Sequence, residues 1–258
     1  PPIGDKLGHP IATNERALMR LASTTVLLAV IALPVTAQVT SPATRSGRST
    51  VYAPRAVVAT SQPLATTAAL AVLQRGGNAI DAAVAAAAVL NVTEPQMTGM
   101  GGDLFAIVWS AKDQKLFGLD GSGRSGSKLN IEALVAAGES QAPSSGARAV
   151  TVPGALAGWE ALLTRFGTLS LGEALATAIR LADEGFPVSP VIAQDWAGEV
   201  EKLKRDPGAR ATYLIEGSRA PTPGEWFRNP DQARTFRRIA AGGIGTASRS
   251  GYAPNTPS

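Results

Sequence analysis

Residues 79–90 constrain the fold of this chain most, because they are apolar on almost every face of a helix. Gly76-Gly77 ends the preceding segment and Asn78 offers an N-cap, so the sequence predicts a helix from Ala79 onward. A helix without a polar face must be buried, and alanine side chains let neighbouring backbones approach closely. We interpret Asp81, in the first turn, as a capping charge that favours the positive end of the helix dipole.

The residues before this helix predict a strand and a second helix. Residues 55–60 are β-prone, and Ser61 offers an N-cap hydroxyl ahead of Pro63. The helix that follows is expected to run to Gln74 and to stop at Gly76-Gly77, where glycine can adopt a left-handed conformation. The buried helix therefore has a helical neighbour on its N-terminal side.

A glycine turn and a hairpin follow the buried helix. Residues 97–103 form the turn, and residues 104–109 and 115–120 are expected to pair as antiparallel strands. A dinucleotide-binding loop is excluded, because these glycines precede a strand, whereas that fingerprint follows a strand and opens a helix. The hairpin delivers the loop Gly-Ser-Gly-Arg-Ser-Gly, residues 121–126, to the edge of a sheet. A guanidinium on such a loop suits bidentate carboxylate binding, which makes Arg124 a candidate substrate-binding residue.

The rest of the chain is interpreted as scaffold. Three helices are expected at 154–165, 171–184 and 191–203, and Pro223-Gly224-Glu225 is expected to form a turn. We expect the aromatic side chains of Trp196, Trp226 and Phe227 to lie in the core.

Composition excludes several classes of site. The 24 Lys and Arg residues against 20 Asp and Glu residues are scattered, which does not favour nucleic acid as a partner. The chain has no cysteine, so disulfides, zinc fingers and a thiol nucleophile are excluded. Its one histidine is His9, in a segment that is expected to be removed, so neither a Ser-His-Asp triad nor a metal cluster is predicted.

The N-terminal residues predict export. Residues 21–33 form an apolar run shorter than the roughly 20 residues that span a bilayer, and Val35-Thr36-Ala37 resembles a cleavage site. We predict a signal peptide within residues 1–37 that is cleaved after Ala37, and a periplasmic or secreted product without a membrane anchor. Translation from Met19 would make residues 1–18 upstream readthrough. Residues 38–54 are expected to form a flexible leader; the alternative for the apolar run is a short buried helix.

Seven motifs stand in one order along the chain: residues 58–65 (VATSQPLA), 76–85 (GGNAIDAAVA), 99–102 (GMGG), 152–154 (VPG), 161–167 (ALLTRFG), 184–189 (EGFPVS) and 227–230 (FRNP). In this order they resemble the gamma-glutamyltransferase family, over about residues 55–243. The resemblance implies an α+β protein with the four-layer αββα sandwich of N-terminal-nucleophile hydrolases. This chain would carry only the large-subunit part of that sandwich.

The resemblance also implies a reaction. Members of the family cleave their own precursor before a threonine, which then attacks a gamma-glutamyl amide such as glutathione and forms an acyl-enzyme. No cofactor or metal is implied. The threonine lies in the small subunit, which would be the partner of this chain, and Thr66, Thr67 and Thr151 lack the family's nucleophile setting. We therefore expect no catalytic residue here and no activity from this chain alone.

Two departures from the family pattern qualify this interpretation. The family places an arginine directly after Leu-Asp-Phe, where this chain has Ser122, two residues before Arg124. The resemblance therefore implies that Arg124 and Ser122 are the substrate-binding residues of this chain. Either Arg124 takes over the role of that arginine, or the acyl group differs, as in cephalosporin-acylase-like amidases. Residues 244–258 leave the pattern and read as a disordered tail, which suggests a frameshift or an early stop. A non-catalytic truncated product, unstable because its strands lack cover, is the remaining alternative.

Overall fold

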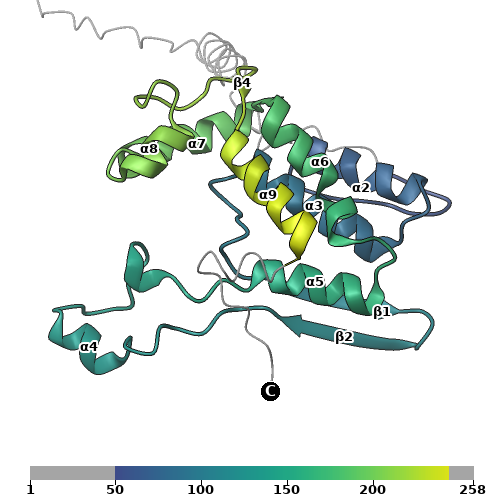
Figure 1. Ribbon diagram of the computed structural model, residues 1–258, viewed down its shortest axis with the longest axis horizontal. Coiled ribbons are helices and arrows are strands. Elements are labelled where there is room, and N and C mark those ends of the chain that lie inside the picture. The colour runs from purple at the N-terminus through teal and green to yellow at the C-terminus, as the bar shows by residue number, and fades with distance from the viewer. Residues whose placement is uncertain (1–49, 244–258) are drawn as a thin grey trace, which may run out of the picture. The chain divides into compact units, whose positions relative to one another are not determined.

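The computed structural model describes residues 50–243 (Figure 1). The predictions for the signal peptide, the translation start, most of the leader and the tail lie outside these residues. The chain divides into two units, Pro1–Tyr52 and Ala53–Ser258, and the second holds all the elements below. In chain order they are α2 (Pro63–Gln74), α3 (Ala79–Thr93), β1 (Phe105–Ser110), β2 (Lys115–Asp120), α4 (Ile131–Ala136), the 3₁₀ turn η1 (Ala147–Ala149), α5 (Ala155–Phe166), α6 (Leu171–Glu184), β3 (Phe186–Pro187), α7 (Pro190–Leu203), α8 (Pro207–Tyr213), β4 (Trp226–Phe227) and α9 (Pro230–Gly242).

The first helix begins and ends as its sequence predicts, but with a different cap. Gln62, not Ser61, caps α2, because its side-chain oxygen accepts from the backbone amides of Leu64 and Ala65. The Ser61 hydroxyl instead donates to Glu94 Oε2 at the end of α3, 2.8 Å away. Gly76 ends the helix with φ +94°, as predicted. The predicted strand at 55–60 is wrong: the structure assigns no strand to these residues, and no described strand pairs with them.

Helix α3 lies at the centre of a helical core. It packs against α2 on one side and α6 on another, and α9 covers α6 (Figure 1). The prediction that this helix is buried is confirmed for ten of its 15 residues. Side chains from α3, α6 and α9 share one hydrophobic core cluster and are almost inaccessible to solvent: Val84, Ala85, Ala88, Val89, Leu175, Ala178, Phe236 and Ile239.

Asp81 does more than cap α3. Its carboxylate accepts from the Asn78 amide in a capping box, and it also accepts from the Thr168 hydroxyl (2.6 Å) and the amides of Thr168 and Leu169. Burial alone would raise the pKa of this side chain, but the hydrogen bonds from Thr168, Asn78 and Leu169 outweigh it and hold the pKa below its ordinary value. The residue therefore joins the start of α3 to the turn that precedes α6.

The hairpin has one covered and one open face. β1 and β2 pair antiparallel in the register Phe105↔Asp120 to Ser110↔Lys115, as predicted to within one residue. Ala106 and Val108 point toward the core, whereas Phe105, Ile107 and Trp109 are exposed. α5 lies along the covered face (Figure 1), where the Arg165 guanidinium stacks 4.5 Å from the centre of the Phe117 ring.

The C-terminal helices hold a second aromatic cluster. Trp196 on α7 is buried, packs edge-on against Phe227 and donates its indole N–H to the Tyr213 carbonyl, as a core assignment requires. The prediction that Trp226 is a core residue is wrong, because it is 61% exposed and donates to the Glu184 carbonyl from the surface. Residues on a two-residue strand alternate sides, so only Phe227 faces inward.

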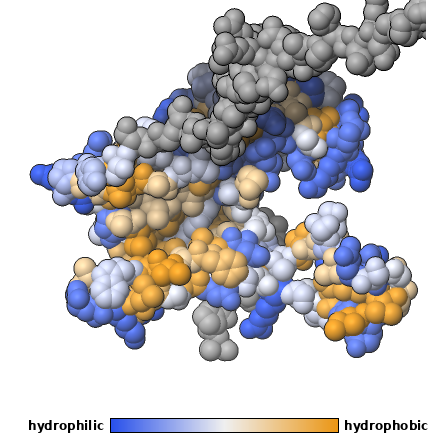
Figure 2. Space-filling view, turned by 180° about the vertical axis from the view of Figure 1, so that it is seen from behind, coloured by the Kyte–Doolittle hydropathy of each residue, from blue (hydrophilic) through white to orange (hydrophobic). Residues whose placement is uncertain are grey.

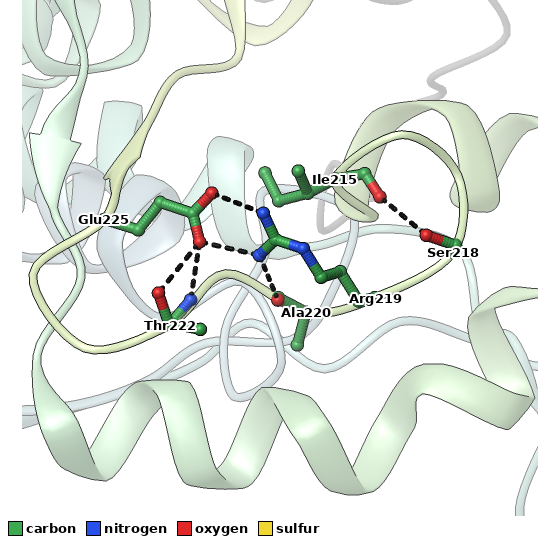
Figure 3. A network of polar contacts seen from close by, with 6 residues as sticks. All are labelled: Ile215, Ser218, Arg219, Ala220, Thr222 and Glu225. Carbon is green, nitrogen blue, oxygen red and sulfur yellow. Dashed lines mark hydrogen bonds and ion pairs between the residues drawn. The ribbon is translucent and has the colours of Figure 1, made fainter.

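A polar network closes the loop between α8 and β4 (Figure 3). The guanidinium of Arg219 donates to both carboxylate oxygens of Glu225, and Thr222 donates to the same carboxylate through its amide and its hydroxyl. These hydrogen bonds, from Arg219 above all, lower the pKa of Glu225 to about 2. The predicted turn at Pro223-Gly224 lies inside this loop, with Gly224 at φ +80°.

Within residues 50–243 the structure is mostly helical, with two two-stranded sheets, β1–β2 and β3–β4. The four layers expected of the complete sandwich are therefore not present in this part of the chain. No helix among the same residues is both long and apolar enough to serve as a membrane span.

Candidate functional site

Three segments far apart in sequence meet at one point, which we call the glycine junction: residues 99–104, 120–124 and 151–155. The Gly121 amide donates to the Leu104 carbonyl (2.7 Å), and the Val152 amide donates to the Arg124 carbonyl (2.9 Å). The amides of Gly154 and Ala155 both donate to the Gly102 carbonyl, at 3.0 and 2.9 Å. Backbone hydrogen bonds thus join the glycine turn to the end of the hairpin and to the start of α5.

Glycine is required where these segments cross. A Cβ on Gly123 would lie 1.6 Å from the Val152 carbonyl oxygen, and one on Gly154 would lie 1.9 Å from the Gly121 carbonyl oxygen. Neither position can carry a side chain without moving backbone. By contrast, Gly126 has open space around it, so the constraint is confined to the crossing itself.

Asp103 is the side chain that ties the junction together, and sequence reasoning missed it. Its Oδ1 accepts from the Gly123 amide and from the Thr151 hydroxyl, each at 3.1 Å. The sequence pattern predicts only that this residue ends a glycine turn. The signal that could have found it is a carboxylate directly before the predicted strand at 104–109, with a glycine loop at the end of the partner strand.

The two predicted site residues lie on this junction, and they differ in their contacts. The amide of Ser122 donates to Asp120 Oδ1 at 2.9 Å. Hydrogen bonds from the hydroxyl and the amide of Ser122 lower the pKa of Asp120. Arg124 is exposed, and among the described residues its guanidinium has no hydrogen bond or ion pair, although its carbonyl is held by Val152. Within residues 50–243 the cation is therefore free to meet a ligand, whereas Ser122 already contacts Asp120.

A cavity of about 230 Å³ opens beside the junction. Its lining comes from α3, the glycine turn and α5, and includes Asn91, Thr98, Asp103, Leu104 and Trp159. It holds both amide and carboxylate groups against an apolar wall. Such a mixture suits a small polar molecule with a short carbon chain.

Comparison with known proteins identifies relatives of this region. The family described as "Gamma-glutamyltranspeptidase" matches residues 65–250. The oxamate amidohydrolase proenzyme of Klebsiella pneumoniae is 41% identical over 187 residues, which cover 70% of this chain and 35% of that protein. The chain spans about a third of the length of the curated relatives it matches.

Two solved structures share the fold of the described region. The cephalosporin acylase of Bacillus halodurans superposes with a TM-score of 0.68 at 39% identity, covering 81% of this chain and 44% of that one. The gamma-glutamyltranspeptidase of Helicobacter pylori superposes with a TM-score of 0.69 at 28% identity, covering 76% and 57%. In both cases the likeness covers part of the larger chain.

Proposed function

Because this chain belongs to the gamma-glutamyltranspeptidase family, we propose that it forms the large-subunit part of an exported amide-cleaving acyltransferase. The observation that carries the proposal is the glycine junction, in which two family motifs, residues 99–102 and 152–154, meet the end of the hairpin beside a cavity, and in which the Arg124 guanidinium is unpaired among residues 50–243. The threonine nucleophile lies outside this chain, in the second part of the same precursor. Its own α-amine takes the proton of the threonine hydroxyl, the threonine oxygen bonds to the amide carbonyl carbon, and the C–N bond breaks so that the amine leaves with that proton. Water or a second amine then takes the acyl group, and the threonine hydroxyl is restored.

In this proposal Arg124 binds the carboxylate of the acyl group. Its carbonyl is fixed by Val152 while its guanidinium is unpaired among residues 50–243. Ser122, which stands where the family has its arginine, is turned toward Asp120 and does not replace it. The substrate class is a gamma-glutamyl amide such as glutathione.

A second candidate differs only in the acyl group. The glycine loop around Arg124 departs from the family pattern, and the chain is 41% identical to a protein named for oxamate and 39% identical to a cephalosporin acylase. An amidase for a shorter or a bulkier acyl group would keep the same nucleophile and the same junction. Hydrolysis rates for a gamma-glutamyl anilide, oxamate and the side-chain amide of a cephalosporin separate these acyl groups.

The exposed face of the hairpin favours the proposal that a partner subunit covers it. Phe105, Ile107, Trp109 and Leu116 are each more than half exposed, and Figure 2 shows hydrophobic residues gathered on the side of the molecule where the hairpin lies. An apolar sheet face of this kind is normally covered. We assign its cover to strands of the second part of the precursor, which would complete the αββα sandwich.

The test has two arms. The 258-residue chain is assayed with the three amides, and no release is expected; release would refute the placement of the nucleophile outside this chain. The DNA beyond codon 258 is read in all three frames for a continuation that carries the threonine. The precursor so encoded should cleave itself and release product, and R124A should raise KM for carboxylate-bearing donors, with K128A as the matched control. N-terminal sequencing of secreted material checks export, for which Gln38 is the expected first residue.

A further inference from the structure

We propose that Asp103 is a positioning residue, whose carboxylate fixes the loop that carries Arg124. The role of Arg124 as the group that meets a substrate carboxylate rests on the proposed function. The rest depends only on contacts between described residues. Asp103 stands two residues before β1, and the loop it holds follows the end of β2, so a single side chain links the segments that flank the hairpin.

The loop has little else to hold it. Residues 121–126 contain three glycines, and Arg124, Ser125 and Gly126 are exposed, so no apolar side chain anchors them in the core. A segment of this kind loses much backbone entropy on ordering. Hydrogen bonds must therefore set its conformation.

Asp103 supplies the hydrogen bond at the decisive place. It accepts from the Gly123 amide, directly before Arg124, while the Val152 amide donates to the Arg124 carbonyl, directly after it. The same carboxylate oxygen accepts from the Thr151 hydroxyl, next to Val152. These hydrogen bonds thus fix the backbone on both sides of Arg124 relative to Asp103 and Val152.

A carboxylate suits this role because an ionised acceptor forms stronger hydrogen bonds than a neutral one and can serve two donors at once. No cation pairs with Asp103 among residues 50–243, so the charge is directed at these two donors. The backbone at Arg124 is therefore fixed, while its guanidinium has no partner among residues 50–243. Because the loop is already ordered, it loses less conformational entropy when the guanidinium binds an anion.

The test measures amide hydrogen exchange in the 258-residue chain and in three variants. In D103A the amides of Gly123 and Val152 should exchange about tenfold faster. D103N keeps an acceptor oxygen and should restore most of the protection, which a loss of fold would not allow. D113A is the matched control, because Asp113 accepts from the Ser110 hydroxyl in the hairpin turn, away from the loop; it should leave both amides unchanged.

A second measurement reads the side chain of Arg124. Oxamate is titrated into the same proteins, and the Arg124 Nε–H resonance is followed. Binding should weaken about tenfold in D103A and recover in D103N. Unchanged exchange at Gly123 and Val152 in D103A would overturn the positioning role. Faster exchange in D103A, together with no shift of Arg124 in the wild-type chain, would leave the Asp103 contact standing and refute the carboxylate-binding role of Arg124 instead.

Discussion

The helical core and the hairpin of this chain differ in how much of their apolar surface is buried. Helices α2, α3, α6 and α9 cover one another, and the alanine-rich α3 is enclosed by neighbours within the same chain. The hairpin has a covered face against α5 and an outer face of large side chains that no described residue covers.

The helical core and the hairpin therefore have different roles: the core provides stability, and the hairpin carries the exposed groups that can contact a ligand or a partner. The core makes its own contacts and sets the stability of residues 50–243. The hairpin and the glycine junction are held mainly by backbone hydrogen bonds, and they carry the candidate site. Substitutions should therefore affect stability in the core, and association or ligand binding at the hairpin.

The largest effect is expected from Trp196→Ala. This side chain is 1% exposed, packs against Phe227 and donates to the Tyr213 carbonyl. Its removal leaves a cavity and an unpaired carbonyl, and it should lower the free energy of unfolding by about 4 kcal/mol in urea titration. Trp226→Ala is the matched control and should cost less than about 1 kcal/mol. If both substitutions lowered the free energy of unfolding equally, the distinction between the buried Trp196 and the exposed Trp226 would be wrong.

Next comes the glycine junction, where Gly123→Ala should cost about 3 kcal/mol. The new Cβ would meet the Val152 carbonyl, so backbone must shift and the hydrogen bond between Val152 and Arg124 must weaken. Gly126→Ala, with open space around it, should stay within about 0.5 kcal/mol of wild type. If both variants unfold at the same urea concentration, the close crossing of these segments is not what holds the junction.

Asp81→Asn should cost about 2 kcal/mol at neutral pH, because an amide nitrogen replaces an oxygen that accepts from Asn78 and Thr168. The folded pKa of Asp81 lies below its ordinary value of 3.8, so its contribution is fully present above that value. The contribution is lost as the pH falls from 3.8 through the lower folded pKa. Stability measured against pH should therefore fall less steeply below pH 3.8 in the variant, and an unchanged acid limb would argue against the four hydrogen bonds.

The sequence predicts the core better than the site, for a physical reason. α2, α3 and α6 begin and end at cap residues such as Asn78 and Gly185, whose preferences act locally. α8 and α9 were not predicted, although Asp206-Pro207 and Asn229-Pro230 carry an N-cap and proline signal of the type used for α2. An N-cap residue followed by proline therefore predicts the start of both helices from the local sequence.

Contacts between distant segments could not be predicted in this way. The bonds from Asp103 to Gly123 and Thr151, and from Asp81 to Thr168, join residues 20 to 87 positions apart. No pattern in a single segment specifies such a partner. The exposure of Trp226 belongs to the same class, because it depends on which side of a two-residue strand meets the core.

The smallest effect on stability, and the sharpest test of the comparison, is expected from Ile107→Thr. Ile107 is 79% exposed on the outer face of β1, and threonine keeps the β-branched shape, so the free energy of unfolding should change by less than about 0.5 kcal/mol. Self-association should fall, because an exposed apolar sheet face promotes it, and sedimentation velocity at several concentrations measures this. Val108→Thr, on the covered face, should instead destabilise the chain by about 1 kcal/mol and leave association unchanged. A reversal of this pattern would mean that the hairpin face assigned to a partner is already covered in the chain itself.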